Sequence, residues 1–265
     1  MAEFQLLSGV RVIDWCYFQT APYASQMLAG LGADVIHVEP RGQGDLLRGV
    51  ERSLGVEYAL PGGRHALFEE FNLNKRGLTL NIKKPKGMEI LHQLIAKSDV
   101  FLTNFRQKAI DRLGMSYVDL REHNPQLIYC SISGFGGRGP AADIPSLDMF
   151  AQARSGAMTT GRDDDEPPAL GIANIGDRIA SITAAFGIMA ALNCRFLHGI
   201  GQELQLSQLG SLMCMQGANI TPVLLVGKPP EKVGPDRPSA ATYTWYKCKD
   251  GRWLAAGGTG EKYWV

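Results

Sequence analysis

The chain has 265 residues, of which 45% are hydrophobic, and its formal net charge at pH 7 is +1. This amount of apolar material is enough for a large folded core. The near-neutral charge argues against the strongly basic class of proteins that bind nucleic acid or anionic membranes.

The cysteines and the N-terminal residues limit the compartment and the kind of site. Five cysteines are widely spaced and form no CxxC pair, so we expect no disulfide framework and no metal site. A reducing, cytoplasmic setting fits this usage. The first residues carry no signal-peptide pattern, and the longest apolar run, 179–192, is too short to span a bilayer. We therefore expect no membrane partner.

Strand and helix patterns alternate through the first half of the chain. The predicted strands are 10–15, 34–39, 78–82, 100–105 and 127–133, and the predicted helices are 22–32, 86–97, 109–113 and 117–122. This alternation predicts a doubly wound α/β domain with a mainly parallel, Rossmann-like sheet. The turn after the first strand lacks the GxGxxG fingerprint, so it does not predict an NAD site. Residues 41–63 fit no regular element.

The second half contains longer helices and ends in the beginning of another unit. The pattern predicts helices at 147–156, 178–198 and 207–226 and a strand at 201–206. A Gly/Pro-rich linker at 227–238 precedes a predicted β-hairpin, 242–248 and 252–256. We divide the chain into a large domain, 1–200, a helix and linker, 201–235, and the start of an incomplete smaller domain, 236–265.

One carboxylate stands between a glycine and the start of the longest predicted helix. Asp177 follows Gly176, and the apolar stripe of the helix begins at Ile179. In one interpretation Asp177 is an N-cap bonded to the backbone N–H groups of the next turn. In the other it is an ionised nucleophile at the mouth of a cleft, approached freely because Gly176 has no side chain. The residue types alone leave both open.

Seven segments, in the same order, resemble the class III CoA-transferases, the CaiB/BaiF family that includes formyl-CoA transferase, carnitine CoA-transferase and α-methylacyl-CoA racemase. The resemblance covers essentially the whole chain. It rests on residues 7–14, 29–39, 72–76, 99–106, 128–136 and 152–156 and on the pair Gly176 and Asp177.

The resemblance implies that Asp177 is the nucleophile in the transfer of coenzyme A from an acyl-CoA donor to a carboxylic acid. Attack on the thioester gives an aspartyl–acyl anhydride, and the returning CoA thiolate gives an aspartyl-CoA thioester. The acceptor acid then repeats these steps in reverse. Each intermediate stays activated while water is excluded. We expect a carboxylate at a helix start to be ionised at neutral pH.

The resemblance also implies which residues bind coenzyme A. Two would line the pantetheine arm, Gln19 and Thr20. Others would flank or contact the nucleotide: Leu80, Asn81, Lys83, Asn104, Phe105 and Arg112. Arg41 is the nearest cation after the second strand, and Asp148 falls where relatives carry an acidic residue close to the active site. For the lysines and arginines between 75 and 86, the alternative is an ordinary solvated surface, and only Lys83 is assigned to the site.

Two other functions compete with the transferase. A racemase would use the same Asp with a histidine directly before the residue matched by Asp148, but that position is Leu147. One subunit of a hetero-oligomeric transferase is the second rival. The resemblance implies a homodimer whose two chains interlock. The family's return segment to the first domain is not in this sequence, and we expect either that the chain is part of a longer protein or that a partner supplies that segment. The stretch 236–243 lacks the glycine-rich lid of formyl-CoA transferases, so oxalate and formate are not the first expected substrates.

Overall fold

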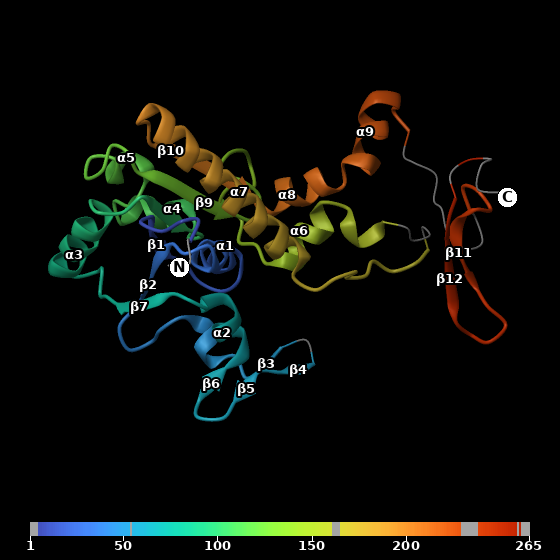
Figure 1. Cartoon of the computed structure of the whole chain (residues 1–265), viewed down its shortest axis with the longest axis horizontal. Helices are drawn as coiled ribbons and strands as arrows, with labels where there is room; N and C mark the ends of the chain where they lie inside the picture. The colour runs from blue at the N-terminus through green and yellow to red at the C-terminus, as the bar shows by residue number, and fades with distance from the viewer. Residues whose placement is uncertain (1–4, 54, 161–164, 229–237, 259, 261–265) are drawn as a thin grey trace.

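The computed structural model describes residues 5–53, 55–160, 165–228, 238–258 and 260, and its centre is a parallel sheet (Figure 1). Six strands pair in the order β10-β9-β8-β1-β2-β7, every pair parallel. Their bounds are β1 Arg11–Trp15, β2 Asp34–Glu39, β7 Arg76–Thr79, β8 Val100–Thr103, β9 Ile128–Ser133 and β10 Gln202–Ser207. From β1 the next strands along the chain, β2 and β7, are added on one side, and the later strands β8, β9 and β10 are added on the other side. This order confirms the predicted doubly wound, Rossmann-like fold and places the topological switch point between β1 and β8.

Helices cover both faces of the sheet because its strands alternate their apolar side chains between two cores. Val12 packs with helices α1 (Thr20–Gly30) and α7 (Ile175–His198). Its neighbour Ile13 packs in the opposite core, with the helices that connect the other strands. Those helices are α3 Pro85–Ile95, α4 Gln107–Arg112 and α5 Tyr117–Leu120.

Several predicted elements change their bounds in the structure. Helix α1 begins at Thr20, two residues earlier than predicted, and Gln19 is its N-cap residue. Strand β7 ends at Thr79, so the expectation that Leu80 and Asn81 belong to the strand was wrong. The single helix expected at 207–226 is two, α8 (Gln208–Met215) and α9 (Gly217–Val226), bent by 81°. Gly217, a poor helix former, stands directly after the bend, and Pro222, which has no N–H for the helix ladder, lies inside α9.

The stretch without a sequence pattern forms small elements between β2 and β7. They are η1 Leu46–Gly49, β3 Arg52–Ser53, β4 Val56–Glu57, β5 Ala59–Leu60, β6 Arg64–His65 and α2 Ala66–Asn72. In Figure 1 they extend to one side of the sheet. Strands too short for a recognisable alternation left no signal in the sequence.

The last elements follow the predicted order. They are α6 Asp148–Arg154, η2 Ala157–Thr159 and the hairpin β11 Tyr243–Lys247 and β12 Trp253–Gly257, which confirms the expected antiparallel pair. Positions 229–237 of the predicted linker and several positions after 258 lie outside the described residues. The division into 1–200, 201–235 and 236–265 stays a prediction.

Helix α7 is longer than the apolar run seen in the sequence. With 24 residues and a mean hydropathy of 1.5 in its most apolar window, it has the length and composition of a membrane span. It packs against α1, α6, α8, β9 and β10. These contacts join α7 to the sheet and to three other helices, and 33% of its most apolar window is buried. Length and composition alone are weak grounds for a membrane span.

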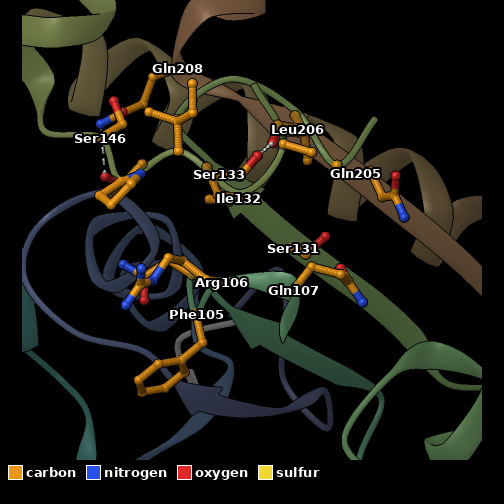
Figure 2. A pocket seen from close by; sticks show the side chains of 17 residues that line it. Phe105, Arg106, Gln107, Ser131, Ile132, Ser133, Ser146, Gln205, Leu206 and Gln208 are labelled. Atoms are coloured by element: carbon orange, nitrogen blue, oxygen red, sulfur yellow. Dashed lines mark hydrogen bonds between the residues drawn. The ribbon is translucent and has the colours of Figure 1, made fainter. Parts of the chain in front are cut away.

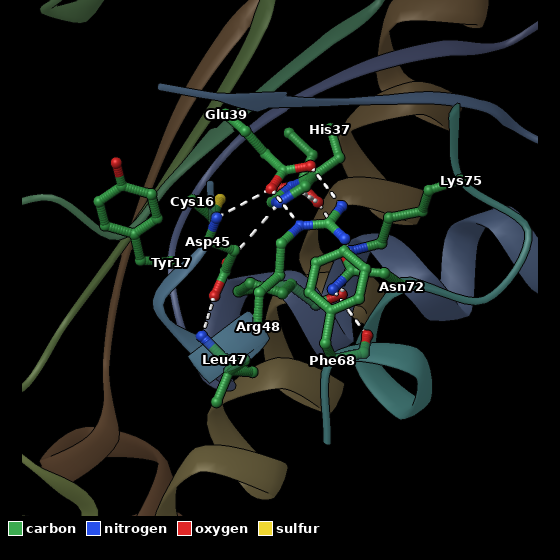
Figure 3. Close-up of polar contacts among 12 residues, drawn as sticks. Cys16, Tyr17, His37, Glu39, Asp45, Leu47, Arg48, Phe68, Asn72 and Lys75 are labelled. Carbon is green, nitrogen blue, oxygen red and sulfur yellow. Dashed lines mark hydrogen bonds and ion pairs between the residues drawn. The ribbon is translucent and has the colours of Figure 1, made fainter. Parts of the chain in front are cut away.

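A buried polar cluster fixes the loop that follows β2 (Figure 3). The Nζ atom of Lys75 lies 2.7 Å from Asp14 Oδ2, and His37 Nδ1 lies 3.1 Å from the same oxygen. Burial alone would raise the pKa of Asp14, but Lys75 and His37 hold it well below its ordinary value. Lys75 is therefore a core ion-pair residue and not part of a solvated surface. Nearby, Arg48 pairs with Glu39 and fastens the loop to the end of β2.

We expect Lys75→Met to lower the free energy of unfolding by about 3–5 kcal/mol, because Asp14 would be left as a buried charge without its cation. Urea unfolding at pH 7 measures the change. Lys86→Met, at an exposed position on α3, is the matched control and is expected to stay within about 0.5 kcal/mol of the unaltered chain. Equal stability of the two variants would contradict the assignment of Lys75 to the core.

Candidate active site

The switch point of the sheet is bridged by one side chain. Asn104, directly after β8, accepts a hydrogen bond from the backbone N–H of Tyr17 at 2.9 Å and donates one to the Tyr17 carbonyl at 2.6 Å. This pair of bonds ties the loop after β1 to the loop after β8. Ligands of doubly wound sheets bind beyond the strand ends at such a point. The loop after β1 leads directly into α1, which starts at Thr20.

Asp177 lies in the first turn of α7 but does not cap it. The helix begins at Ile175, and its N-cap, Asn174, makes no side-chain cap bond. Instead, Asp148 at the start of α6 accepts a hydrogen bond from the Asp177 backbone N–H at 3.1 Å through Oδ1. Asp148 thus satisfies a helix N–H group that a cap residue would otherwise bind. The N-cap interpretation of Asp177 is wrong, and its carboxylate is available for other contacts.

The side chain of Asp177 is held by two donors from other elements. The Thr20 hydroxyl donates to Oδ1, and Gln208 Nε2, at the start of α8, donates to the same oxygen at 2.5 Å. All three residues are buried. On the other side, Gln152 Nε2 donates to Asp148 Oδ2 at 2.6 Å and orients that carboxylate. The starts of four helices, α1, α6, α7 and α8, therefore meet at Asp177.

Burial is the main influence on the charge of Asp177, and it raises the pKa of the carboxyl to about 6. The donor bonds from Thr20 and Gln208 lower this pKa, and the nearby Asp148 charge raises it. Asp177 is consequently ionised at pH 7, but its charge is less favourable than that of an ordinary surface carboxylate. This combination suits a carboxylate that acts as a nucleophile.

Two adjoining cavities surround this group. Asp177 faces a cavity of about 600 Å³, which Tyr17, Leu147, Asn174 and other residues also line. A second cavity, of about 300 Å³, lies beside the ends of β9 and β10 and is lined by Ser131, Ser133 and Gln205 among others (Figure 2). Both are bordered by a shared set of residues: Thr20, Asn104, Phe105, Arg106, Ser146 and Gln208.

The structure brings together six of the residues singled out in the sequence. The lining of the larger cavity includes Gln19, Thr20, Asn104, Phe105, Asp148 and Asp177. The other five predicted site residues, Arg41, Leu80, Asn81, Lys83 and Arg112, do not line either cavity. Leu80 packs against the core on one face of the sheet, and Lys83 and Arg112 are exposed.

Sequence reasoning missed Gln208 and Arg106. Gln208 follows β10 directly and starts α8, so it stands at a strand-to-helix connection, as Gln19 and Thr20 do after β1. The predicted strand 201–206 and the predicted helix from 207 already put Gln208 at a helix start, but a glutamine at a helix start is not by itself a signal for chemistry. Arg106 belongs to the 99–106 segment and is the one cation among the described residues that line the cavities.

No group of three or more potential metal-ligating side chains forms within the described part of the chain. The five cysteines are free thiols, and Cys16 and Cys130 are buried. Burial raises the pKa of both buried thiols, and at Cys16 the charge of Asp14 acts in the same direction. These thiols are suited to packing and not to nucleophilic attack.

Comparison with known proteins places this site in context. The family model described as CoA-transferase family III matches residues 7–265. The chain is 34% identical over 252 residues to (R)-2-hydroxy-4-methylpentanoate CoA-transferase of Clostridioides difficile, covering 94% of this chain and 61% of that protein. It is 42% identical over 201 residues to formyl-CoA:oxalate CoA-transferase of Streptomyces avermitilis, covering 76% of this chain and 47% of that protein.

A solved structure shares the fold. A CaiB/BaiF family protein from Brucella suis superposes with a TM-score of 0.83 at 30% identity, covering 96% of this chain and 67% of the other. The chain thus spans between about half and two thirds of the length of these proteins.

We expect Gly176→Ala to lower the free energy of unfolding by about 1–3 kcal/mol, because a Cβ there would lie 2.9 Å from Asp148 Oδ1 and 3.1 Å from Leu212 Cδ1. Gly187→Ala, in the same helix, is the matched control. Its Cβ would meet Leu204 Cδ1 at an ordinary 3.6 Å, so we expect a gain of up to about 1 kcal/mol. Urea unfolding measures the change in the free energy of unfolding for each variant. An equal change in the two variants would contradict the close packing of Gly176 on Asp148.

We expect Asp177→Asn to raise the free energy of unfolding at pH 7.5 by about 2–3 kcal/mol, because the substitution removes a charge that the folded state disfavours. The carboxyl has a pKa of about 6 in the folded state and of about 3.9 in the unfolded state. The raised folded pKa means that the native state binds more protons than the unfolded state between these values. The unaltered chain therefore loses stability as the pH rises from about 4 to about 6. Unfolding curves across this range should show the two proteins converging at low pH, and a constant difference would contradict the shift.

Proposed function

The chain belongs to CoA-transferase family III, and we propose that it transfers coenzyme A from an acyl-CoA donor to a carboxylic acid with Asp177 as the covalent nucleophile. The observation that carries this proposal is the arrangement of Asp177. It is a buried carboxylate that other helices hold at a cavity of about 600 Å³, instead of capping its own helix. A carboxylate nucleophile needs ionisation, an open approach and protection from water.

The proposed reaction uses the two oxygens of Asp177 differently. Thr20 and Gln208 both bind Oδ1, and the described residues give Oδ2 no donor. Oδ2 attacks the thioester carbonyl carbon, the carbon–sulfur bond breaks, and the CoA thiolate leaves with the electron pair. The thiolate then attacks Cγ of Asp177 and expels the donor acid, leaving an aspartyl-CoA thioester. The acceptor acid reverses both steps and restores the carboxylate.

The proposed binding path for coenzyme A follows the switch point of the sheet. Gln19, Thr20, Asn104 and Phe105 line the larger cavity beside Asp177, where a pantetheine arm would reach the nucleophile. Arg106 adds a cation at the border of both cavities, suited to an anionic group of a substrate. Three cations outside the cavities remain candidates for phosphate contacts: Arg41, Lys83 and Arg112. Two other residues outside the cavities remain candidates for contact with the nucleotide, Leu80 and Asn81.

The racemase alternative receives no support from this site. A racemase needs a second base facing the carbon next to the thioester. The position before Asp148 is the exposed Leu147, and no histidine is among the described residues that line the two cavities. We therefore do not propose racemisation.

The proposal includes an assembly, because the chain leaves apolar surface exposed. Phe186 and Phe196 on α7 are 74% and 87% exposed, and Leu224 and Leu225 on α9 are 78% and 80% exposed. Exposed apolar patches of this kind favour contact with another protein surface. We propose a homodimer with interlocked chains, in the cytoplasm. The alternative is that the chain is one subunit of a hetero-oligomer. The mass of the native complex distinguishes the two, because a homodimer has twice the mass of the chain and a hetero-oligomer does not.

We expect incubation with a panel of acyl-CoA donors to add an acyl group or a CoA moiety to Asp177, because both intermediates are covalent. The panel includes formyl-CoA and a short 2-hydroxyacyl-CoA, and intact-mass and peptide mass spectrometry locate the adduct. Asp177→Asn should abolish it, whereas Asp111→Asn, exposed on α4, should retain it. Absence of an adduct with every donor, in a chain shown to bind CoA, would contradict the proposal.

A further inference from the structure

Two side-chain donors converge on the same oxygen of Asp177. Thr20, the first residue of α1, donates through its hydroxyl, and Gln208, the first residue of α8, donates through Nε2 at 2.5 Å. Gln208 Nε2 also lies 3.5 Å from the Thr20 hydroxyl oxygen. The exposed fractions of the three residues are 8%, 6% and 9% for Thr20, Gln208 and Asp177. The two donors therefore act on Oδ1 in a site that is largely shielded from water.

Both donors are held in this orientation by other residues. Ser146 Oγ lies 3.3 Å from Gln208 Oε1 (Figure 2) and 3.2 Å from the Leu147 carbonyl oxygen, and its hydroxyl proton can be donated to either. Contact of Oε1 with Ser146 leaves the amide N–H₂ group of Gln208 on the side of Asp177. Ser181 in α7 donates to the backbone carbonyl of Thr20 and fastens the start of α1 to α7. Donors that are fixed before the reaction need no rearrangement when charge develops on the oxygen they bind.

We infer that Thr20 and Gln208 form an oxyanion-binding pair for the enzyme's own carbonyl, Oδ1 of Asp177, in the steps where a nucleophile attacks Asp177 Cγ. This inference rests on the proposed function. It adds Gln208 as a catalytic residue and gives Thr20 a role beyond contact with the pantetheine arm.

The pair acts in particular steps of the reaction. When the CoA thiolate attacks the anhydride at Cγ, the new carbon–sulfur bond forms and the C=O π electrons move to Oδ1. The tetrahedral centre then re-forms the C=O bond and breaks the Cγ–Oδ2 bond, so the donor acid leaves with Oδ2. Attack of the acceptor acid on the aspartyl-CoA thioester places negative charge on Oδ1 again. In the first step, attack on acyl-CoA, the charge develops on the substrate oxygen and not on Oδ1.

This difference between steps gives a readout that a purely structural role would not produce. Loss of a donor to Oδ1 slows the conversion of the anhydride to the aspartyl-CoA thioester more than it slows formation of the anhydride. The anhydride adds only the acyl group to the protein mass, whereas the thioester adds the CoA moiety. Intact-mass spectrometry after rapid mixing with one acyl-CoA, without acceptor, therefore reports the ratio of the two intermediates.

We expect Gln208→Met to shift this ratio toward the acyl adduct and to lower kcat by roughly 10²–10³-fold, the usual effect of losing one oxyanion donor. KM for acyl-CoA should change little. Thr20→Val should act in the same direction, and Thr20→Ser, which keeps the hydroxyl, should restore the unaltered ratio. Gln93→Met, an exposed position on α3, is the matched control and should leave ratio and rate unchanged. Thermal unfolding and CoA binding confirm that each variant is folded.

A second readout is the pH profile of kcat/KM. The hydrogen bond from Gln208 lowers the pKa of Asp177, so its loss should move the acidic limb of the profile to higher pH. An unchanged adduct ratio in Gln208→Met and Thr20→Val, with both adducts present in the unaltered chain, would overturn this inference alone. Absence of both adducts in the unaltered chain would overturn the proposed function and this inference with it.

Discussion

The active-site arrangement depends on one hydrogen bond, from the backbone N–H of Asp177 to the carboxylate of Asp148. A helix start leaves N–H groups without partners, and an aspartate in the first turn is a common side chain to bind them. Here the partner comes from another helix, α6. The carboxylate of Asp177 consequently faces the cavity, and its own contacts come from α1 and α8. A residue type that ordinarily stabilises a helix is thereby available for chemistry.

Several features of the structure support this hydrogen bond. Gly176 allows Asp148 to approach the backbone of α7, since a Cβ there would lie within 2.9 Å of its oxygen. Gln152, one turn further along α6, orients the other oxygen of Asp148. The two carboxylates are brought close enough for Asp148 to raise the pKa of Asp177, an effect that the donors on Oδ1 oppose. The site is thus a balance between burial, which disfavours the charge, and donors that stabilise it.

The sequence predicted the fold well because its signals were local and periodic. Alternating strand and helix patterns identified the six strands of the sheet and the long helix α7, and the family resemblance pointed to Gln19, Thr20 and Asn104, which line the larger cavity. The role of Lys75 was not predictable in this way. Its pairing with Asp14 joins positions distant in sequence, and a lysine in a polar stretch ordinarily indicates a solvated surface. Gln208 was missed for a related reason, because its contacts with Asp177 and Thr20 join positions 31 and 188 residues apart in the chain.

The Asp177 carboxylate is buried and bound by Thr20 and Gln208 from other helices, and its titration tests this arrangement most directly. The measurement is a pH titration of the carbon-13 chemical shift of Asp177 Cγ, assigned by comparison with Asp177→Asn. We expect a midpoint of about 6, because burial and Asp148 outweigh the donors from Thr20 and Gln208. A midpoint at or below about 3.9, the value for an exposed or N-capping aspartate, would contradict it.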